Sequence, residues 1–163
     1  MTLVVPAPID SLGLWIEQLI AESTGKEGKG ILPVSGESLA GPSAYGNDRV
    51  FVYIHTRDSG DSLEPKLGAL EAAGHPVIRR VIHDPLDLGE EFFVWEFATP
   101  IAGALIGINP FDQPNVQESK DNTKRLLGVY EKQKSFGEEK ESASEGHIRT
   151  YSSESAPGKG NLN

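Results

Sequence analysis

Two apolar segments on either side of an amphipathic one constrain the fold most. RVFVYIH, residues 49–55, is too continuously apolar to leave one face in water, which indicates a strand covered on both sides. PVIRRVI, residues 76–82, is predicted to be a second strand. Between them a helix is predicted over about 63–74, with Leu67 and Leu70 facing inward. A strand, a helix and a strand in this order predict a right-handed parallel crossover, and therefore an α/β fold with a layered, mainly parallel sheet.

Further elements are predicted on both sides of this unit. Residues 2–5 form a strand fragment. A helix follows, which begins at Asp10 or Ser11 and stops at Gly25. Residues 87–107 are apolar almost all round, so the helix that they predict should be buried.

The composition divides the chain into two parts. A last helix is predicted over about 115–134, and from Gly137 onward the sequence is mostly Glu, Ser, Gly and Lys. Such a segment cannot bury enough apolar surface to offset the entropy that is lost when it is ordered. We therefore predict one folded domain over residues 1–136 and a polar, flexible tail over 137–163.

Composition argues against several classes of function. The formal net charge is −9 and the basic residues are scattered, which argues against a nucleic-acid surface. No stretch approaches the roughly 18 apolar residues of a membrane span, and the N-terminus does not resemble a signal peptide. The chain has no cysteine, which excludes disulfides and thiolate chemistry and favours a cytoplasmic location. The histidines show no metal-ligand spacing, so no metal is expected.

One carboxylate lies where a negative charge is unfavourable. Glu22 comes seven residues after Trp15 and three after Leu19, so the helical pattern predicts that it faces inward with them. It also lies in the last turn, where the helix macrodipole disfavours an anion. A carboxylate in such a position is a candidate general base. The structural alternative is a side chain that bends to solvent.

A lysine repeats this pattern on the last predicted helix. Lys120 comes four residues after Val116 and seven before Leu127, on a face that is otherwise apolar. Taken alone, such a lysine is more often one whose ammonium reaches solvent from the edge of the stripe. Taken together, Glu22 and Lys120 predict a shared polar pocket or, alternatively, a buried structural ion pair.

Two longer segments carry more information than their periodicity. They are WIEQLIAESTGKEGKGILPV, residues 15–34, and GINPFDQPNVQESKDN, residues 107–122. The first resembles the ESxGK segment of the phosphoglucose isomerase (glucose-6-phosphate isomerase) family, and the second resembles its C-terminal signature. The resemblance runs from about Thr2 to Leu127 and is greatest to the isomerase part of fused transaldolase/phosphoglucose isomerase proteins.

This resemblance implies a fold and a reaction. The fold is a three-layer α/β/α sugar-isomerase (SIS) domain, the second of two in a longer enzyme. The reaction interconverts glucose 6-phosphate and fructose 6-phosphate in glycolysis and gluconeogenesis, through a cis-enediol and without metal or nucleotide. By the resemblance, Glu22 matches the catalytic base, Lys120 matches the lysine that handles the ring and hydroxyl oxygens, and Gln113 matches a substrate-contacting glutamine.

Two departures from the family pattern bear on activity. The family places its ring-opening histidine in a GQH loop, whereas residues 31–50 contain no histidine. No SxSxxT-like phosphate loop is present either, so a missing N-terminal SIS domain is an expected partner, together with a second copy in a homodimer. This chain alone is expected to be weakly active or inactive. The alternative is a non-catalytic module for sugar-phosphate binding or oligomerisation.

Overall fold

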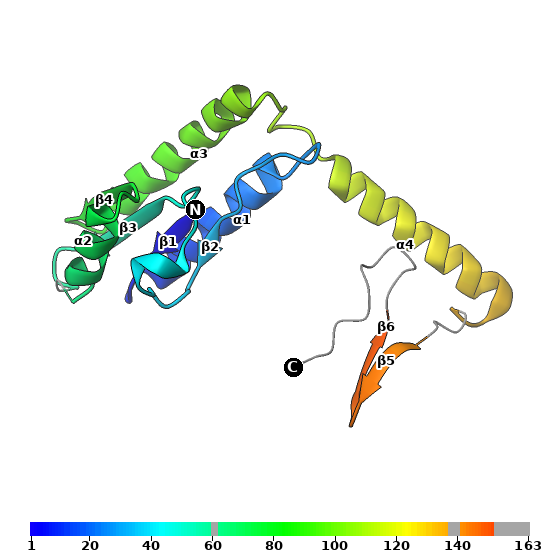
Figure 1. Cartoon of the computed structure of the whole chain (residues 1–163). Helices are drawn as coiled ribbons and strands as arrows, with labels where there is room; N and C mark the ends of the chain where they lie inside the picture. The colour runs from blue at the N-terminus through cyan, green and yellow to red at the C-terminus, as the bar shows by residue number, and fades with distance from the viewer. Residues whose placement is uncertain (60–61, 137–140, 152–163) are drawn as a thin grey trace. The chain divides into compact units, whose positions relative to one another are not determined.

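The computed structural model describes residues 1–59, 62–136 and 141–151. It divides into two compact units, Met1–Asn115 and Val116–Asn163, which are described one at a time (Figure 1). The elements of the first unit are β1 (Thr2–Val4), α1 (Asp10–Thr24), β2 (Val34–Ser35), a 3-10 turn (Pro42–Ala44), β3 (Phe51–Thr56), α2 (Glu64–Ala72), β4 (Val77–Ile82) and α3 (Asp87–Ile106). No helix in the described part of the chain is long and apolar enough to span a membrane.

The sheet of the first unit is parallel, as the strand, helix and strand pattern predicts. Its strand order is β2-β1-β3-β4, and every pairing in it is parallel. Among the four strands of this sheet, β2 is the one that the sequence does not predict, because it is only two residues long and lies in a loop. It is held to β1 by a hydrogen bond from the main-chain nitrogen of Val34 to the main-chain oxygen of Met1, 2.9 Å long.

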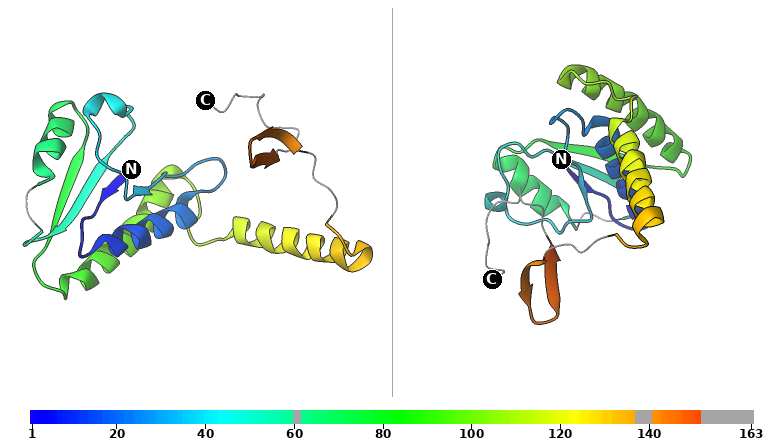
Figure 2. Two further views of the ribbon diagram at one scale, coloured as in Figure 1. Left: turned by 90° about the horizontal axis from the view of Figure 1, so that it is seen from below. Right: turned by 90° about the vertical axis from the view of Figure 1, so that its right-hand side faces the viewer.

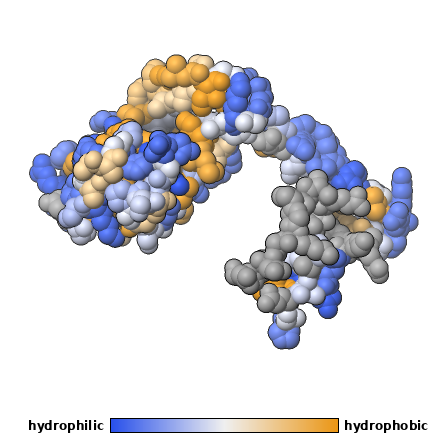
Figure 3. Space-filling view, in the orientation of Figure 1, coloured by the Kyte–Doolittle hydropathy of each residue, from blue (hydrophilic) through white to orange (hydrophobic). Residues whose placement is uncertain are grey.

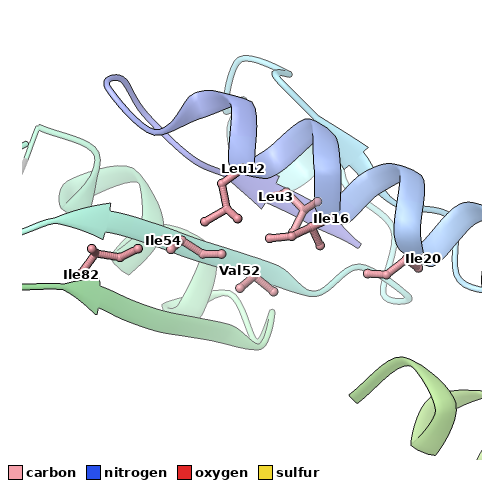
Figure 4. Close-up of a cluster of buried hydrophobic side chains, with 7 residues drawn as sticks. All are labelled: Leu3, Leu12, Ile16, Ile20, Val52, Ile54 and Ile82. Atoms are coloured by element: carbon pink, nitrogen blue, oxygen red, sulfur yellow. The ribbon is translucent and has the colours of Figure 1, made fainter. Parts of the chain in front are cut away.

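Apolar clusters cover both faces of this sheet, because successive side chains of a strand point to opposite faces. The cluster under α1 consists of Leu3, Leu12, Ile16, Ile20, Val52, Ile54 and Ile82 (Figure 4). The cluster on the other face consists of Val4, Leu39, Phe51, Tyr53, Leu67 and Leu70. Helices α1 and α3 therefore form one layer and α2 another (Figure 2). The predicted α/β fold with three layers is confirmed.

Helix α3 is fastened to the edge strand β4 by an ion pair. The Arg80 guanidinium donates to Glu91 through Nε, which lies 2.6 Å from Oε1 and 2.8 Å from Oε2. The indole nitrogen of Trp95 donates to the same carboxylate at 3.2 Å. Glu91 is only 4% exposed, so these donors supply the hydrogen bonds that a buried carboxylate requires.

The prediction that α3 is buried all round is wrong. Its inward side carries Glu91, Thr99 and Gly103, which are buried. A stripe at four-residue spacing faces outward and is here called the outer stripe of α3: Phe93, Phe97, Ile101 and Leu105, exposed by 67%, 60%, 48% and 84%. Figure 3 shows apolar side chains gathered along this helix. One face of α3 packs within the first unit, and no element among the described residues of that unit covers the other face.

The second unit contains most of the last helix and a hairpin. Helix α4 (Pro114–Gln133) starts at the end of the first unit, as the sequence predicts, and β5 (Glu141–Glu145) pairs antiparallel with β6 (Ile148–Tyr151). This hairpin lies in the segment 137–163 that the sequence predicts to be a polar tail. Residues 137–140 and 152–163 lie outside the described residues. The domain boundary at 136 and the flexibility of the tail stay predictions.

The Glu91 ion pair predicts that two adjacent glutamates, Glu90 and Glu91, contribute differently to the free energy of unfolding. We expect Glu91→Gln to lower the free energy of unfolding by about 1–3 kcal/mol, because Arg80 and Trp95 would lose a charged acceptor. Glu90, whose side chain is 70% exposed and lies 3.7 Å from Arg80, is the matched control. Glu90→Gln should change the free energy by less than about 0.5 kcal/mol. Urea unfolding of the three proteins measures both values, and equal effects would contradict the structural role of Glu91.

Candidate active site

Glu22 lies in the last turn of α1, and its side chain is exposed, so the predicted inward orientation is wrong. The buried stripe of α1 is centred on Ile16 and Ile20, and Trp15 lies at its edge, half-buried. Because Glu22 points in nearly the same direction as Trp15, it falls outside that stripe. Gln18 Nε2 donates a hydrogen bond to Glu22 Oε1 at 3.0 Å. The burial on which the sequence argument for a base rested is therefore not found in this unit.

The chain leaves α1 through a tight turn from Lys26 to Lys29. The main-chain nitrogen of Lys29 donates to the main-chain oxygen of Lys26 at 2.8 Å. Both central residues have positive φ, 54° at Glu27 and 71° at Gly28, which is typical of a type I′ hairpin turn. Lys26 and Lys29 pair across this turn, so their side chains lie on the same side of it.

Thr24 anchors the turn to the helix. Its hydroxyl is buried, donates to the main-chain oxygen of Ile20 at 2.8 Å and accepts from the main-chain nitrogen of Ile31 at 3.0 Å. One hydroxyl thus forms hydrogen bonds with a main-chain oxygen of α1 and with a main-chain nitrogen beyond the 26–29 turn. The sequence gives no indication of this role, because Ile31 is remote from the helix pattern.

Lys26 connects the two segments that resemble the family's motifs, residues 15–34 and 107–122. Its side chain is 3% exposed, and its ammonium forms an ion pair with Asp112 Oδ1 at 2.9 Å. The ammonium also donates to the main-chain oxygen of Asn109 at 3.0 Å and to that of Asp112. Three oxygens therefore surround a group that has three protons, as a buried charge requires.

Lys29 reaches the end of α3 beside this contact. Its Nζ lies 3.5 Å from the main-chain oxygen of Ile106 and 3.3 Å from that of Gly107. The helix ends there because Gly107 is left-handed, with φ 77°, and Ile108 N donates back to the oxygen of Gly103 at 3.0 Å. The carbonyl end of a helix carries partial negative charge, so ammonium groups near it are favourable.

Gln113 comes directly after the segment that Lys26 holds. Its side chain is exposed, and the next residue, Pro114, begins α4. Glu22 lies about one helical turn before Lys26, so the contacts of Lys26 bring the segments of Glu22 and Gln113 to one place. Lys120 is exposed on α4 and belongs to the second unit. Its roles in a shared pocket or in an ion pair stay predictions.

The segments joined by Lys26 lie at the amino edge of the sheet. Helices α1 and α3 run back along the strands that precede them, so both end where the strands begin. A small cavity shows this arrangement, because it is lined by Met1 before β1, by Ile20 and Thr24 of α1, and by Thr99 and Ala102 of α3. Glu22 and the loop before Gln113 are therefore next to the starts of the strands.

A larger cleft, of about 710 Å³, opens at the opposite edge, beyond the carboxyl ends of β1, β3 and β4. Open α/β sheets commonly bind ligands at that edge. The polar residues that line it are Thr56, Arg57, Asp58, Ser59, His83 and Asp84. Main-chain N–H groups of His83 and Asp84 donate to Asp87 at 2.8 and 3.1 Å, and they hold the pKa of the Asp87 carboxyl below its usual value. None of the described residues that line this cleft is Glu22 or Gln113.

Among the described residues, no group of three or more His, Asp or Glu side chains is placed to hold a metal ion. The charged groups at the amino edge are instead two lysines and an aspartate, with Glu22 exposed nearby. Of these groups, the exposed Glu22 carboxylate is accessible to a polar ligand and can accept a proton from it.

Comparison with known proteins gives a consistent set of relatives, although no family model matches the chain. The chain is 33% identical over 150 residues to the glucose-6-phosphate isomerase of Leptospira interrogans, a match that covers 69% of this chain and 34% of the relative. It is 31% identical over 159 residues to that of Leptospira biflexa, covering 74% and 35%. It is 30% identical over 165 residues to that of Heliobacterium modesticaldum, covering 77% and 37%.

The first unit is a three-layer α/β domain, and charged side chains gather at the amino edge of its sheet. With these relatives, the chain belongs to the glucose-6-phosphate isomerase family, which is a family of enzymes. It spans 34–37% of the length of the relatives that it matches. The resemblance found in the sequence is confirmed for the family, and the assignment to fused transaldolase proteins stays a prediction.

The anchoring role of Thr24 predicts a loss of stability on a shape-conserving substitution. We expect Thr24→Val to lower the free energy of unfolding by about 1–3 kcal/mol, because the N–H of Ile31 would lose its acceptor. The neighbouring Ser23→Ala is the control and should cost less than about 0.5 kcal/mol. Thermal and urea unfolding measure both. A Thr24→Val protein as stable as the parent would show that the hydroxyl does not hold the turn.

Proposed function

We propose that this chain supplies part of the active site of a glucose-6-phosphate isomerase, which interconverts glucose 6-phosphate and fructose 6-phosphate. The observation that carries the proposal is the contact of Lys26 with Asn109 and Asp112, which joins the two segments that resemble the family's motifs. The names of the relatives support the same activity. The contact supports one site that is formed by both segments.

Glu22 is the proposed base of this reaction. An exposed carboxylate at the end of α1 is accessible to a ligand, and Gln18 orients it by donating to Oε1. In the open-chain sugar the carboxylate accepts the proton from C2, which leaves a cis-enediolate with its negative charge on O1. A proton then passes from the O2 hydroxyl to O1, and the carboxyl group returns its proton to C1, so that O2 becomes the ketone oxygen. One carboxylate can do both, because the two carbons lie on the same side of the planar intermediate. This proposal needs accessibility and not the burial that the sequence pattern predicted.

Gln113 and Lys120 are proposed to bind the substrate. The amide of Gln113 can both donate to and accept from sugar hydroxyls. The ammonium of Lys120 can donate to the ring and hydroxyl oxygens, which carry the charge that develops on the enediol. Both side chains are exposed within their own units, as substrate-binding groups must be before a ligand covers them.

The remaining parts of the active site are proposed to come from additional protein, namely an N-terminal SIS domain and a second copy in a homodimer. The relatives are about three times as long as the segment that they share with this chain, since the match covers 34–37% of each. The outer stripe of α3 supports such a neighbour, because contiguous exposed apolar side chains usually mark an interface. The absence of cysteine supports a cytoplasmic location for the assembly.

A second candidate function is a non-catalytic module for sugar-phosphate binding or oligomerisation. Two observations favour it: residues 31–50 contain no histidine for ring opening, and the outer stripe of α3 suits association. A coupled assay for fructose 6-phosphate isomerisation separates the candidates. It is applied to this chain and to the natural gene product that contains it. Robust turnover by the gene product would exclude the second candidate, and no turnover by either would exclude the first.

The proposed base predicts the effect of removing its charge. In the natural gene product, Glu22→Gln should lower kcat by about 10²–10⁴-fold, because the amide cannot accept the proton from C2. The circular dichroism spectrum and Tm should stay those of the parent, because Glu22 is exposed. The same coupled assay measures kcat.

The control is Glu27→Gln, which removes a charge from an exposed residue five positions further along the chain. It should keep kcat within about twofold of the parent, since surface charges away from reacting atoms contribute little. If Glu22→Gln also stays within twofold, Glu22 is not the base.

A further inference from the structure

We propose that Lys26 is a positioning residue, which holds the segment 109–113 against the end of α1 and so fixes Gln113 relative to Glu22. The geometric part of this proposal rests on the contacts of Lys26 alone. Its catalytic consequence rests on the function proposed above. Lys26 is one of two lysines in the turn GKEGK, residues 25–29, and the sequence pattern does not distinguish them.

The surroundings of Lys26 show that it does not serve as a substrate-binding lysine. Its side chain is 3% exposed, whereas that of its partner Asp112 is 49% exposed. The ammonium has three protons, and it has three oxygen partners in the chain: the main-chain oxygens of Asn109 and Asp112 and the carboxylate of Asp112. A ligand would have to displace one of them. The charge is therefore used within the protein.

The contacts of Lys26 restrain a segment that is otherwise fastened on one side. Pro110 packs on α3, where a Cβ added to Gly103 would lie 3.0 Å from Pro110 Cγ. Asn109 Oδ1 accepts from the main-chain nitrogen of Phe111 at 3.1 Å, and the Phe111 side chain is 79% exposed. These contacts hold the segment to α3 and to itself. Lys26 adds the connection to α1, the helix of Glu22.

Asp112 is held through two of its groups, and this determines the direction of the next residue. Its main-chain oxygen and its carboxylate both bind the same ammonium, which fixes the peptide plane and the side-chain rotamer together. Gln113 is attached to that peptide plane, so its position follows from it. A misplacement of about 1 Å in an active site can cost on the order of 100-fold in rate. A buried ion pair at this point can therefore control catalysis without touching the substrate.

The first arm of the test measures the segment itself in the chain. Lys26→Met keeps the length of the side chain and removes its donors. Hydrogen exchange of the amides in 107–113 should become at least about 10-fold faster, because the segment would open without unfolding the domain. The matched control is Lys66→Met, since Lys66 also donates to a main-chain oxygen, that of Leu39, at 3.3 Å. This control should leave exchange in 107–113 unchanged.

A milder variant keeps this arm decisive if Lys26→Met does not fold. Asp112→Asn removes the charge pair and keeps the main-chain acceptor, so exchange in 107–113 should rise by a smaller factor in the same direction. Unchanged exchange in every folded variant at Lys26 or Asp112 would overturn the proposal. Faster exchange across the whole sheet would overturn it as well, because Lys26 would then act on general stability.

The second arm measures kcat and KM of the natural gene product. Lys26→Met should lower kcat by about 10- to 100-fold with KM changed less than about threefold, because the reacting groups would be misplaced while the other binding groups remain. A loss of stability alone would lower the active fraction and leave kcat per folded molecule unchanged. Unchanged kcat in an active enzyme would overturn the positioning role. If the parent product has no isomerase activity, the proposed function fails, and the exchange arm still decides the role of Lys26.

Discussion

The organisation of the proposed active site depends on one buried ammonium group. Lys26 lies 83 and 86 residues before Asn109 and Asp112, and its contacts with them join the end of α1 to the loop after α3. A lysine is stable at 3% side-chain exposure only when its three donors are satisfied, and the loop supplies an oxygen for each of them. The loop conformation and the burial of Lys26 are therefore mutually dependent. Glu22 and Gln113 lie on the two segments that this contact joins.

The fold explains why these segments meet at the amino edge of the sheet. Each helix of a parallel α/β unit runs back along the sheet, so α1 and α3 both end near the starts of the strands. The Arg80 and Glu91 ion pair fixes helix α3 near its start. At its other end, the left-handed Gly107 terminates the helix and Lys29 donates to the Gly107 oxygen. The proposed site thus lies at helix ends, away from the cleft at the carboxyl edge.

Much of the fold could be predicted from local patterns, and the contacts of the site could not. Strand β3 and helix α1 follow from apolar periodicity and end at recognisable residues. The orientation of Glu22 could not be predicted, because α1 has apolar residues in two overlapping stripes and only packing on the sheet selects the one with Ile16 and Ile20. The burial of Lys26 depends on oxygens more than 80 residues away, and no local pattern contains that information. The resemblance of the ESTGK segment to the family motif assigns a role to its glutamate, Glu22, and none to its lysine, Lys26.

The coupling between Lys26 and Asp112 tests the central claim most directly. A double-mutant cycle with Lys26→Met and Asp112→Asn, measured by urea unfolding of the chain, isolates the interaction between the two side chains. The structure predicts a coupling free energy of at least about 1 kcal/mol, because the ammonium is buried and directly paired. Effects that add to within about 0.3 kcal/mol would contradict the account, because the Lys26 and Asp112 side chains would then not hold the two segments together.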